Sequence, residues 1–132
     1  MEKEMDIGGK KVRMRASAAV PRLYRLRFRR DILQDMIRLA EAYNRVAEAG
    51  KKKLPNQKSQ GFDPLDLELF ENVAYIMARH ADPTIPDTPE EWLEAFPMFS
   101  IYTVLPGILE LWGLNMEMTA ESKKKLAAVA GK

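Results

Sequence analysis

The stretch that decides the fold is YRLRFRRDILQDMIRLAEAYNRV, residues 24–46. Its apolar and aromatic residues recur every three or four positions, which is the spacing of one buried helix face. The repeating positions are Tyr24, Phe28, Ile32, Met36, Leu39, Tyr43 and Val46. We expect a helix from Ala18 to Ala49 that starts at Ser17 as N-cap and is ended by Gly50. A break near Arg30-Asp31 stays open, because Asp31 could restart the helix as a second N-cap.

Upstream of this helix, residues 1–16 predict an N-terminal β-hairpin or strand. Gly8-Gly9 can supply the positive φ angles of a two-residue turn. Val12, Met14 and Ala16 then alternate with basic residues, the period of a half-buried strand. A two-stranded hairpin is marginal in water, so it must lie on a helical body.

Downstream, three helix starts can be read. Asp63-Pro64 and Thr88-Pro89 each place an N-cap residue before a proline at the first helical position. A last helix should start near Ser100, contain Pro106 and end at Gly113. Residues 51–61 predict an exposed loop and residues 116–132 a lysine-rich tail.

These elements fit one mainly α domain of four to five helices with a short N-terminal hairpin, the helical part covering residues 17–115. The chain has 132 residues and no cysteine, so one modest core is expected and a disulfide framework is excluded. No signal peptide is visible, and the longest apolar stretch, Ile101 to Leu114, is too short to span a bilayer. We expect a small intracellular domain that is not a membrane protein.

The net charge of +2 hides a strong asymmetry. Residues 1–30 carry ten Lys/Arg against three Asp/Glu, whereas residues 62–121 carry one basic residue against twelve acidic ones. Such a division predicts a charged partner, pairing of the two halves within the molecule, or pairing between copies. A nucleic-acid surface is disfavoured because no base-stacking or groove-reading motif accompanies the basic residues.

The sequence offers no catalytic or cofactor-binding constellation. His80 is the only histidine, so a two-histidine metal site within the chain is excluded, and no nucleophile stands at a suitable spacing from it. The acidic residues Glu90, Glu91 and Glu94 fall at a helix start, where they complement the helix dipole. We therefore expect neither an enzyme nor a cofactor.

The order of several segments carries a resemblance. Ile7-Gly8-Gly9-Lys10 precedes the strand, SAAVP stands at residues 17–21, and YRLRFRRDI follows at residues 24–32. FENVAY at residues 70–75, EWL at 91–93, VLP at 104–106, Leu111-Trp112 and the lysines at 123–125 complete the pattern. In this order and spacing the chain resembles the tail assembly chaperone family of long-tailed phages and prophages of Gram-positive bacteria. It departs from that pattern at Arg29, where the family often has glycine.

The resemblance implies a non-enzymatic protein that binds the tape measure protein, keeps it soluble and aids assembly of the tail tube, whose subunits are a further potential partner. It also implies that the protein acts in the bacterial cytoplasm and is absent from the finished virion. A small helical domain suits such a role, because it can hold a partner helix in an apolar groove. We expect this groove between the first long helix and the helix of residues 102–112. The residues proposed for it are Arg22, Arg25, Arg29, Tyr102, Leu105, Leu109 and Trp112.

Two other classes remain open. A basic nucleic-acid-binding or regulatory module would use the basic residues of the first helix and the preceding strand, namely Arg13, Arg15, Arg22, Arg25 and Arg29. A structural tail or head–tail connector subunit would be retained in purified virions.

Overall fold

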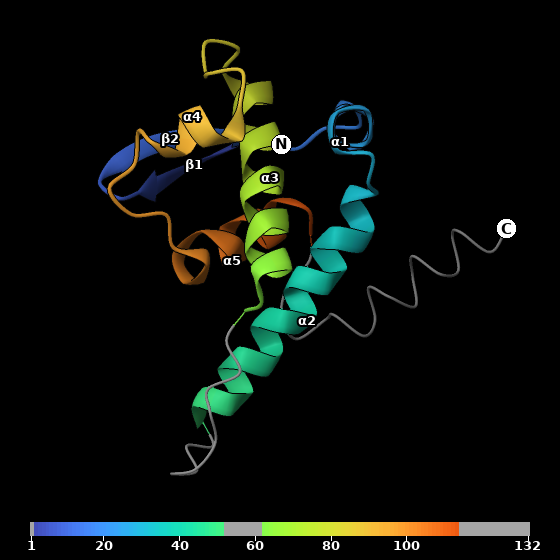
Figure 1. The fold of residues 1–132 in the computed structure, drawn as a ribbon, viewed down its shortest axis with the longest axis vertical. Coiled ribbons are helices and arrows are strands. Elements are labelled where there is room, and N and C mark those ends of the chain that lie inside the picture. Colours follow the sequence, from blue (N-terminus) through green and yellow to red (C-terminus); the bar gives the residue numbers. More distant parts are fainter. Residues whose placement is uncertain (1, 52–61, 114–132) are drawn as a thin grey trace, which may run out of the picture.

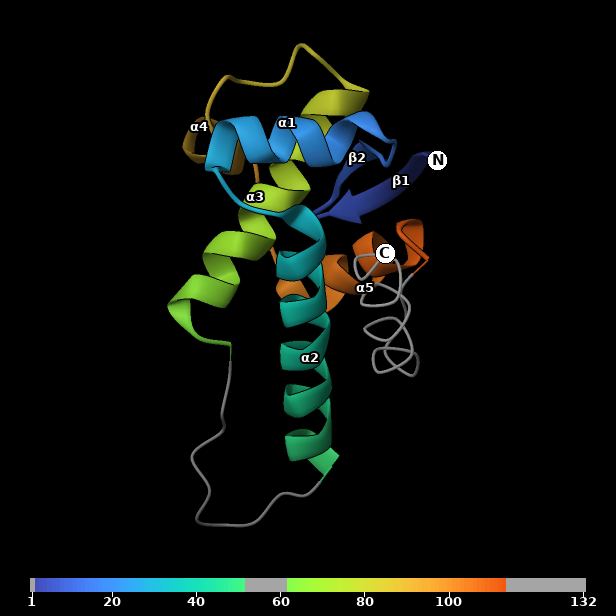
Figure 2. The same cartoon turned by 90° about the vertical axis from the view of Figure 1, so that its right-hand side faces the viewer.

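Helix α3 (Pro64–Ala81) lies at the centre of the molecule and contacts most of the other elements. The computed structural model describes residues 2–51 and 62–113 of the chain. An antiparallel hairpin and helices α4 (Pro89–Leu93) and α5 (Ile101–Leu111) cover one side of α3, and helices α1 (Ala19–Phe28) and α2 (Ile32–Lys51) cover another (Figures 1 and 2). The predicted mainly α domain with a short N-terminal hairpin is therefore confirmed.

The hairpin pairs strand β1 (Glu2–Ile7) with strand β2 (Lys10–Arg15), and Ile7 stands opposite Lys10. Gly8 and Gly9 form the turn with φ angles of 58° and 86°, values that glycine adopts without strain. Val12 and Met14 are buried, as their alternation predicts. Strand β2 lies on α3 and β1 on α5, so the hairpin rests on a helical body.

The first long helical segment is divided into α1 and α2. Arg29 has a φ of 58° in the left-handed region, and its N–H donates to the carbonyl of Arg25 at 2.9 Å. Asp31 then caps α2, because its carboxylate accepts from the N–H of Leu33 at 2.9 Å. The break near Arg30-Asp31, which the sequence left open, is therefore present, and the expected single helix from Ala18 to Ala49 is two helices.

Two predicted helix ends need correction. The N-cap of α1 is Ala18 rather than Ser17, whose hydroxyl accepts from the N–H of Ala19 in a local turn and also contacts His80. Helix α2 continues through Gly50 to Lys51, because glycine weakens a helix without necessarily ending it. The rest of the predicted loop, residues 52–61, and the predicted tail lie outside the described residues.

The remaining caps follow the sequence. Asp63 and Asp66 form a reciprocal capping box at the start of α3, and Thr88 accepts from the N–H of Glu91 at the start of α4. Trp92 is buried against Tyr75, with ring centroids 5.8 Å apart. Helix α5 contains Pro106 and is followed by Gly113, which has a φ of 72°.

Candidate protein interface

Helix α1 buries one side and exposes another that combines leucine with arginine. Val20 and Tyr24 point into the core. The side chains of Leu23 and Leu26 are 40% and 59% exposed, although leucine is usually buried. Four arginines share the exposed side of this segment with them, namely Arg22, Arg25, Arg27 and Arg29.

A hollow of about 460 Å³ lies between α1 and the carboxyl-terminal end of α3. We call it the α1–α3 groove. Its apolar lining comes from Leu23, Leu26, Ile76 and Pro83, and its polar lining from Arg27, Arg79 and His80. An apolar floor with a few cationic groups at its edge is a common form of a protein or ligand site.

Arginine side chains fix one wall of this groove. The guanidinium of Arg27 lies 5.0 Å from the ring centroid of Tyr75 and donates to the carbonyl of Asp87. Arg79 donates to the carbonyl of Ile85 at 2.8 Å and pairs with the Asp87 carboxylate at 2.9 Å. The segment between α3 and α4 is therefore tied to both helices beside the groove.

The other three arginines of α1 are not neutralised in this way. Within residues 2–51 and 62–113, no carboxylate forms an ion pair with Arg22, Arg25 or Arg29. Over the same ranges, Lys3–Glu110 at 2.9 Å is the ion pair that joins the basic first 30 residues to the acidic residues 62–113. Within the described residues, close ion pairs between the two halves therefore neutralise little of the charge asymmetry.

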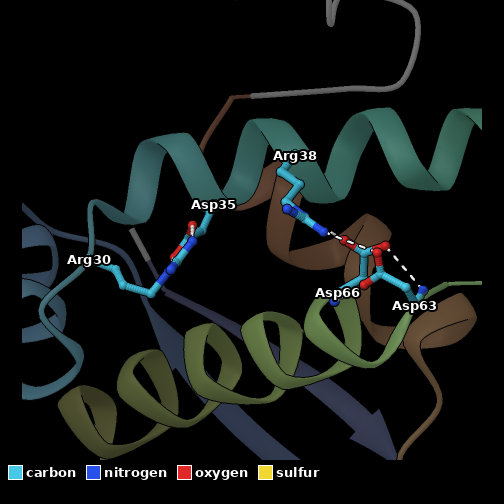
Figure 3. A network of polar contacts seen from close by, with 5 residues as sticks. All are labelled: Arg30, Asp35, Arg38, Asp63 and Asp66. Carbon is cyan, nitrogen blue, oxygen red and sulfur yellow. Dashed lines mark hydrogen bonds and ion pairs between the residues drawn. The ribbon is translucent and has the colours of Figure 1, made fainter.

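The position of α1 depends on a buried carboxylate at its junction with α2 (Figure 3). Asp35 is 3% exposed and accepts from the Tyr24 hydroxyl at 2.7 Å and from Nε and Nη2 of Arg30, each at 2.8 Å. Burial, followed by the hydrogen bond to Asp35, raises the pKa of Tyr24. The hydrogen bond to Asp35 also raises the pKa of Arg30.

A second buried carboxylate joins α2 to α3. Asp66 is almost fully buried and accepts from Nε of Arg38 at 2.8 Å, while Nη2 of Arg38 reaches Asp63 at 3.1 Å (Figure 3). The pKa of Asp63 is lowered, chiefly because its carboxylate accepts from the backbone N–H of Asp66. The same three residues thus cap α3 and hold it against α2.

The structure separates the residues that the sequence grouped into one groove. Leu105 and Leu109 are fully buried in the core, so the expected surface groove along this face of α5 is wrong. Helix α5 packs against β1, α3 and α2, and that packing covers its leucine face. Tyr102 is exposed and its ring lies 5.4 Å from that of Phe62, far along α5 from Trp112.

A different hollow lies between the start of α1 and the end of α5, and of the residues proposed for the groove only Trp112 lines it. Trp112 is half-buried, donates from Nε1 to the sulfur of Met77 at 3.3 Å, and lines a hollow of about 320 Å³. Pro21 and residues 16–18, at the start of α1, form the opposite side of this hollow. Arg22, Arg25 and Arg29 lie on the exposed side of α1, as expected.

Sequence reasoning overlooked Leu23 and Leu26. Both are apolar residues that fall outside the buried stripe of Tyr24, Phe28 and Ile32. That mismatch is a readable signal, because an apolar residue off the core stripe of an otherwise basic helix face is a candidate contact residue.

His80 has a structural partner that the sequence did not suggest. Its Nε2 lies 2.9 Å from the hydroxyl of Ser17, so it ties the β2–α1 junction to the end of α3. Asp82, two residues further along the chain, accepts from the hydroxyl and N–H of Thr84, and these bonds lower the pKa of Asp82. Across the described ranges, no three His, Cys, Asp or Glu side chains are grouped so that they could hold a metal ion.

Comparison of the chain with family models, curated proteins and solved structures gives no match in any of the three. Among the described residues, no helix has the length and apolar character needed to cross a membrane. The candidate site is a groove with an apolar floor, beside arginines that have no ion-pair partner in residues 2–51 and 62–113.

Proposed function

We propose that this chain is a tail assembly chaperone that binds the tape measure protein through the α1–α3 groove. The observation that carries the proposal is the exposed side of α1, where Leu23 and Leu26 lie among arginines that form no ion pair with any described residue. An amphipathic helix could place apolar side chains against the leucines and acidic side chains against the arginines. A tape measure protein is a long, largely helical chain that would offer such segments repeatedly.

The sequence resemblance supports the same role. The family often has glycine where this chain has Arg29, and Arg29 has the left-handed backbone conformation that glycine adopts most easily. The departure therefore preserves a break between two helices at the expected position. In this proposal the protein acts in the cytoplasm of the bacterial host and leaves before the tail is complete.

The leucine pair favours a protein partner over nucleic acid. A surface that follows a phosphate backbone needs cations and hydrogen-bond donors, and exposed leucines gain little from phosphates. Arg13, one residue of the nucleic-acid alternative, is already 3.5 Å from Glu2 across the hairpin. Binding of the purified chain to duplex DNA with a steep salt dependence would support that alternative and contradict ours.

Co-expression tests the chaperone proposal directly. The tape measure protein encoded downstream should be more soluble with this chain than without it. Leu23→Asp combined with Leu26→Asp should remove the gain, because it places carboxylates in the apolar floor of the groove. Met98→Asp is the matched control, since Met98 is an exposed apolar residue outside the groove. Unchanged tape measure solubility with and without the wild-type chain would contradict the proposal.

A further inference from the structure

The chain carries a second exposed surface whose charge is opposite to that of α1. At the start of α3, Leu65 and Leu67 are 38% and 40% exposed. Glu68 and the half-buried Glu71 lie between them around the helix. From these complementary surfaces we infer that the α1–α3 groove, with the exposed Arg22, Arg25 and Arg29 beside it, binds the start of α3 of a second copy of this chain.

The exposed faces of α1 and α3 carry complementary side chains. On α1, Arg22 and Arg25 lie three residues apart on one exposed face, and Leu23 and Leu26 form a neighbouring leucine stripe. Arg29 follows directly after the helix as its exposed C-cap. On α3, Glu68 and Glu71 form a glutamate stripe beside Leu65. Laid against each other, the two helices can pair arginine with glutamate and leucine with leucine at the same time.

The glutamates of the α3 surface repel one another, and Arg30, which acts electrostatically on Glu68, is already paired with Asp35. Partial burial raises the pKa of Glu71, and the nearby charges of Glu68 and Glu90 raise it further. We call these three residues the acidic cluster. Over the described ranges, no basic side chain forms an ion pair with any of them. Arginines from another molecule would relieve this repulsion.

The groove and the glutamates lie at different heights along α3 of one molecule. The groove includes Arg79, which is eleven residues from Glu68 on the same helix, a separation of about 16 Å at 1.5 Å per residue. Glu68 acts electrostatically on Arg30 of its own molecule, but among the described residues no carboxylate forms an ion pair with Arg22, Arg25 or Arg29. In this inference a second copy supplies those carboxylates.

Such a contact is small and depends on charge. Two short helix faces bury less surface than a stable dimer needs, so the association should be weak and sensitive to salt. It does not depend on the chaperone role. If both hold, a client helix and a second copy compete for the same groove.

The test uses the full chain in sedimentation velocity. The mean mass of the wild type should rise with concentration at about 50 mM salt and return to that of a monomer at about 0.5 M. Arg22→Glu with Arg25→Glu should weaken association at least about tenfold, and so should Glu68→Lys with Glu90→Lys. The arginine variant is then acidic both on α1 and at the acidic cluster, and the Glu68/Glu90 variant is basic at both surfaces. An equimolar mixture of the two variants should therefore associate again.

Lys10→Glu with Lys11→Glu is the control, because it makes the same change in net charge on the hairpin, and it should still associate. A wild type that stays monomeric up to about 1 mM at low salt would overturn the inference. The inference would also be overturned if the Lys10/Lys11 control associated as weakly as the arginine variant. A mixture of the two charge-reversed variants that stays monomeric, while both keep the circular dichroism of the wild type, would overturn it as well. The variant with Glu68→Lys and Glu90→Lys leaves Leu23 and Leu26 intact. It should therefore still keep a client protein soluble even where self-association is lost.

Discussion

Replacing Asp35 by alanine should destabilise the corner between α1 and α2 more than other single changes of a polar residue there. The substitution leaves the buried Tyr24 hydroxyl without its acceptor and Arg30 without its carboxylate. An unpaired buried hydroxyl costs about 1–3 kcal/mol, and breaking a fully buried ion pair costs about 3–5 kcal/mol. Because the Arg30 side chain is 43% exposed and can regain water, we expect a total loss of about 3 kcal/mol.

A double-mutant cycle separates the hydroxyl from the charge. Tyr24→Phe alone should cost about 1 kcal/mol, because it removes one hydrogen bond and leaves the Asp35–Arg30 pair in place. The double variant Tyr24→Phe with Asp35→Ala should lose less stability than the sum of the losses of the two single variants. The phenylalanine has no hydroxyl that the loss of Asp35 could leave unpaired. The expected coupling is about 1 kcal/mol.

Urea unfolding followed by circular dichroism measures these free energies, with a loss of about 3 kcal/mol being a large part of a typical total of about 5–15 kcal/mol. Asn at position 35 is the isosteric control and should cost less than Ala, since it can still accept from Tyr24. The reasoning is refuted if Asp35→Ala costs less than about 1 kcal/mol, or if its effect and that of Tyr24→Phe simply add.

Three further predictions concern backbone strain and charge. Arg29→Gly should raise the free energy of unfolding by about 0.5–1 kcal/mol, whereas Arg29→Ala should not, because only glycine removes the backbone strain at a φ of 58°. Thermal unfolding of the two variants checks this prediction. Glu71→Gln should stabilise the protein at pH 7, because the raised pKa of Glu71 means that its ionised form weakens the fold. Solvent screens this partly exposed side chain, so the gain should be no more than about 0.5 kcal/mol. In a pH series of unfolding midpoints the gain should vanish below about pH 4, and a gain that persists there would contradict the charge argument. Gly8→Ala should be more damaging than Gly9→Ala, since both have positive φ but only the Cβ at position 8 would lie 2.8 Å from the carbonyl oxygen of Met98; equal unfolding midpoints would refute this reading of the turn.

The sequence predicted the elements well wherever the deciding interactions are local. Asp31, Asp63 and Thr88 each accept hydrogen bonds from backbone N–H groups within three residues, so their roles are visible in a short window. The Gly8-Gly9 turn is local in the same sense. Ser17 was misread because His80, 63 positions away, also competes for its hydroxyl.

The candidate site was harder to predict, because exposure depends on which helix covers which. Leu105 and Leu109 of α5 and Leu23 and Leu26 of α1 all read as apolar residues on amphipathic helices. Packing against the hairpin and α3 covers the first pair, whereas the second pair lines the open groove beside α3 and stays largely exposed. No periodicity within one helix contains that information.

The break at Arg29 decides where the exposed face of α1 lies. The buried stripe of Tyr24, Phe28 and Ile32 runs through the break, so a straight helix would satisfy the same pattern. The left-handed residue instead lets α1 turn away from α2 and lie over the end of α3, and the Asp35 network holds it there. Leu23 and Leu26 then face the groove while the arginines beside them stay in solvent. A variant that weakens the network of Tyr24, Arg30 and Asp35 should therefore reduce binding at the groove, and the reduction should follow the loss of order in α1. None of these three residues lines the groove, so the effect would act through the position of α1.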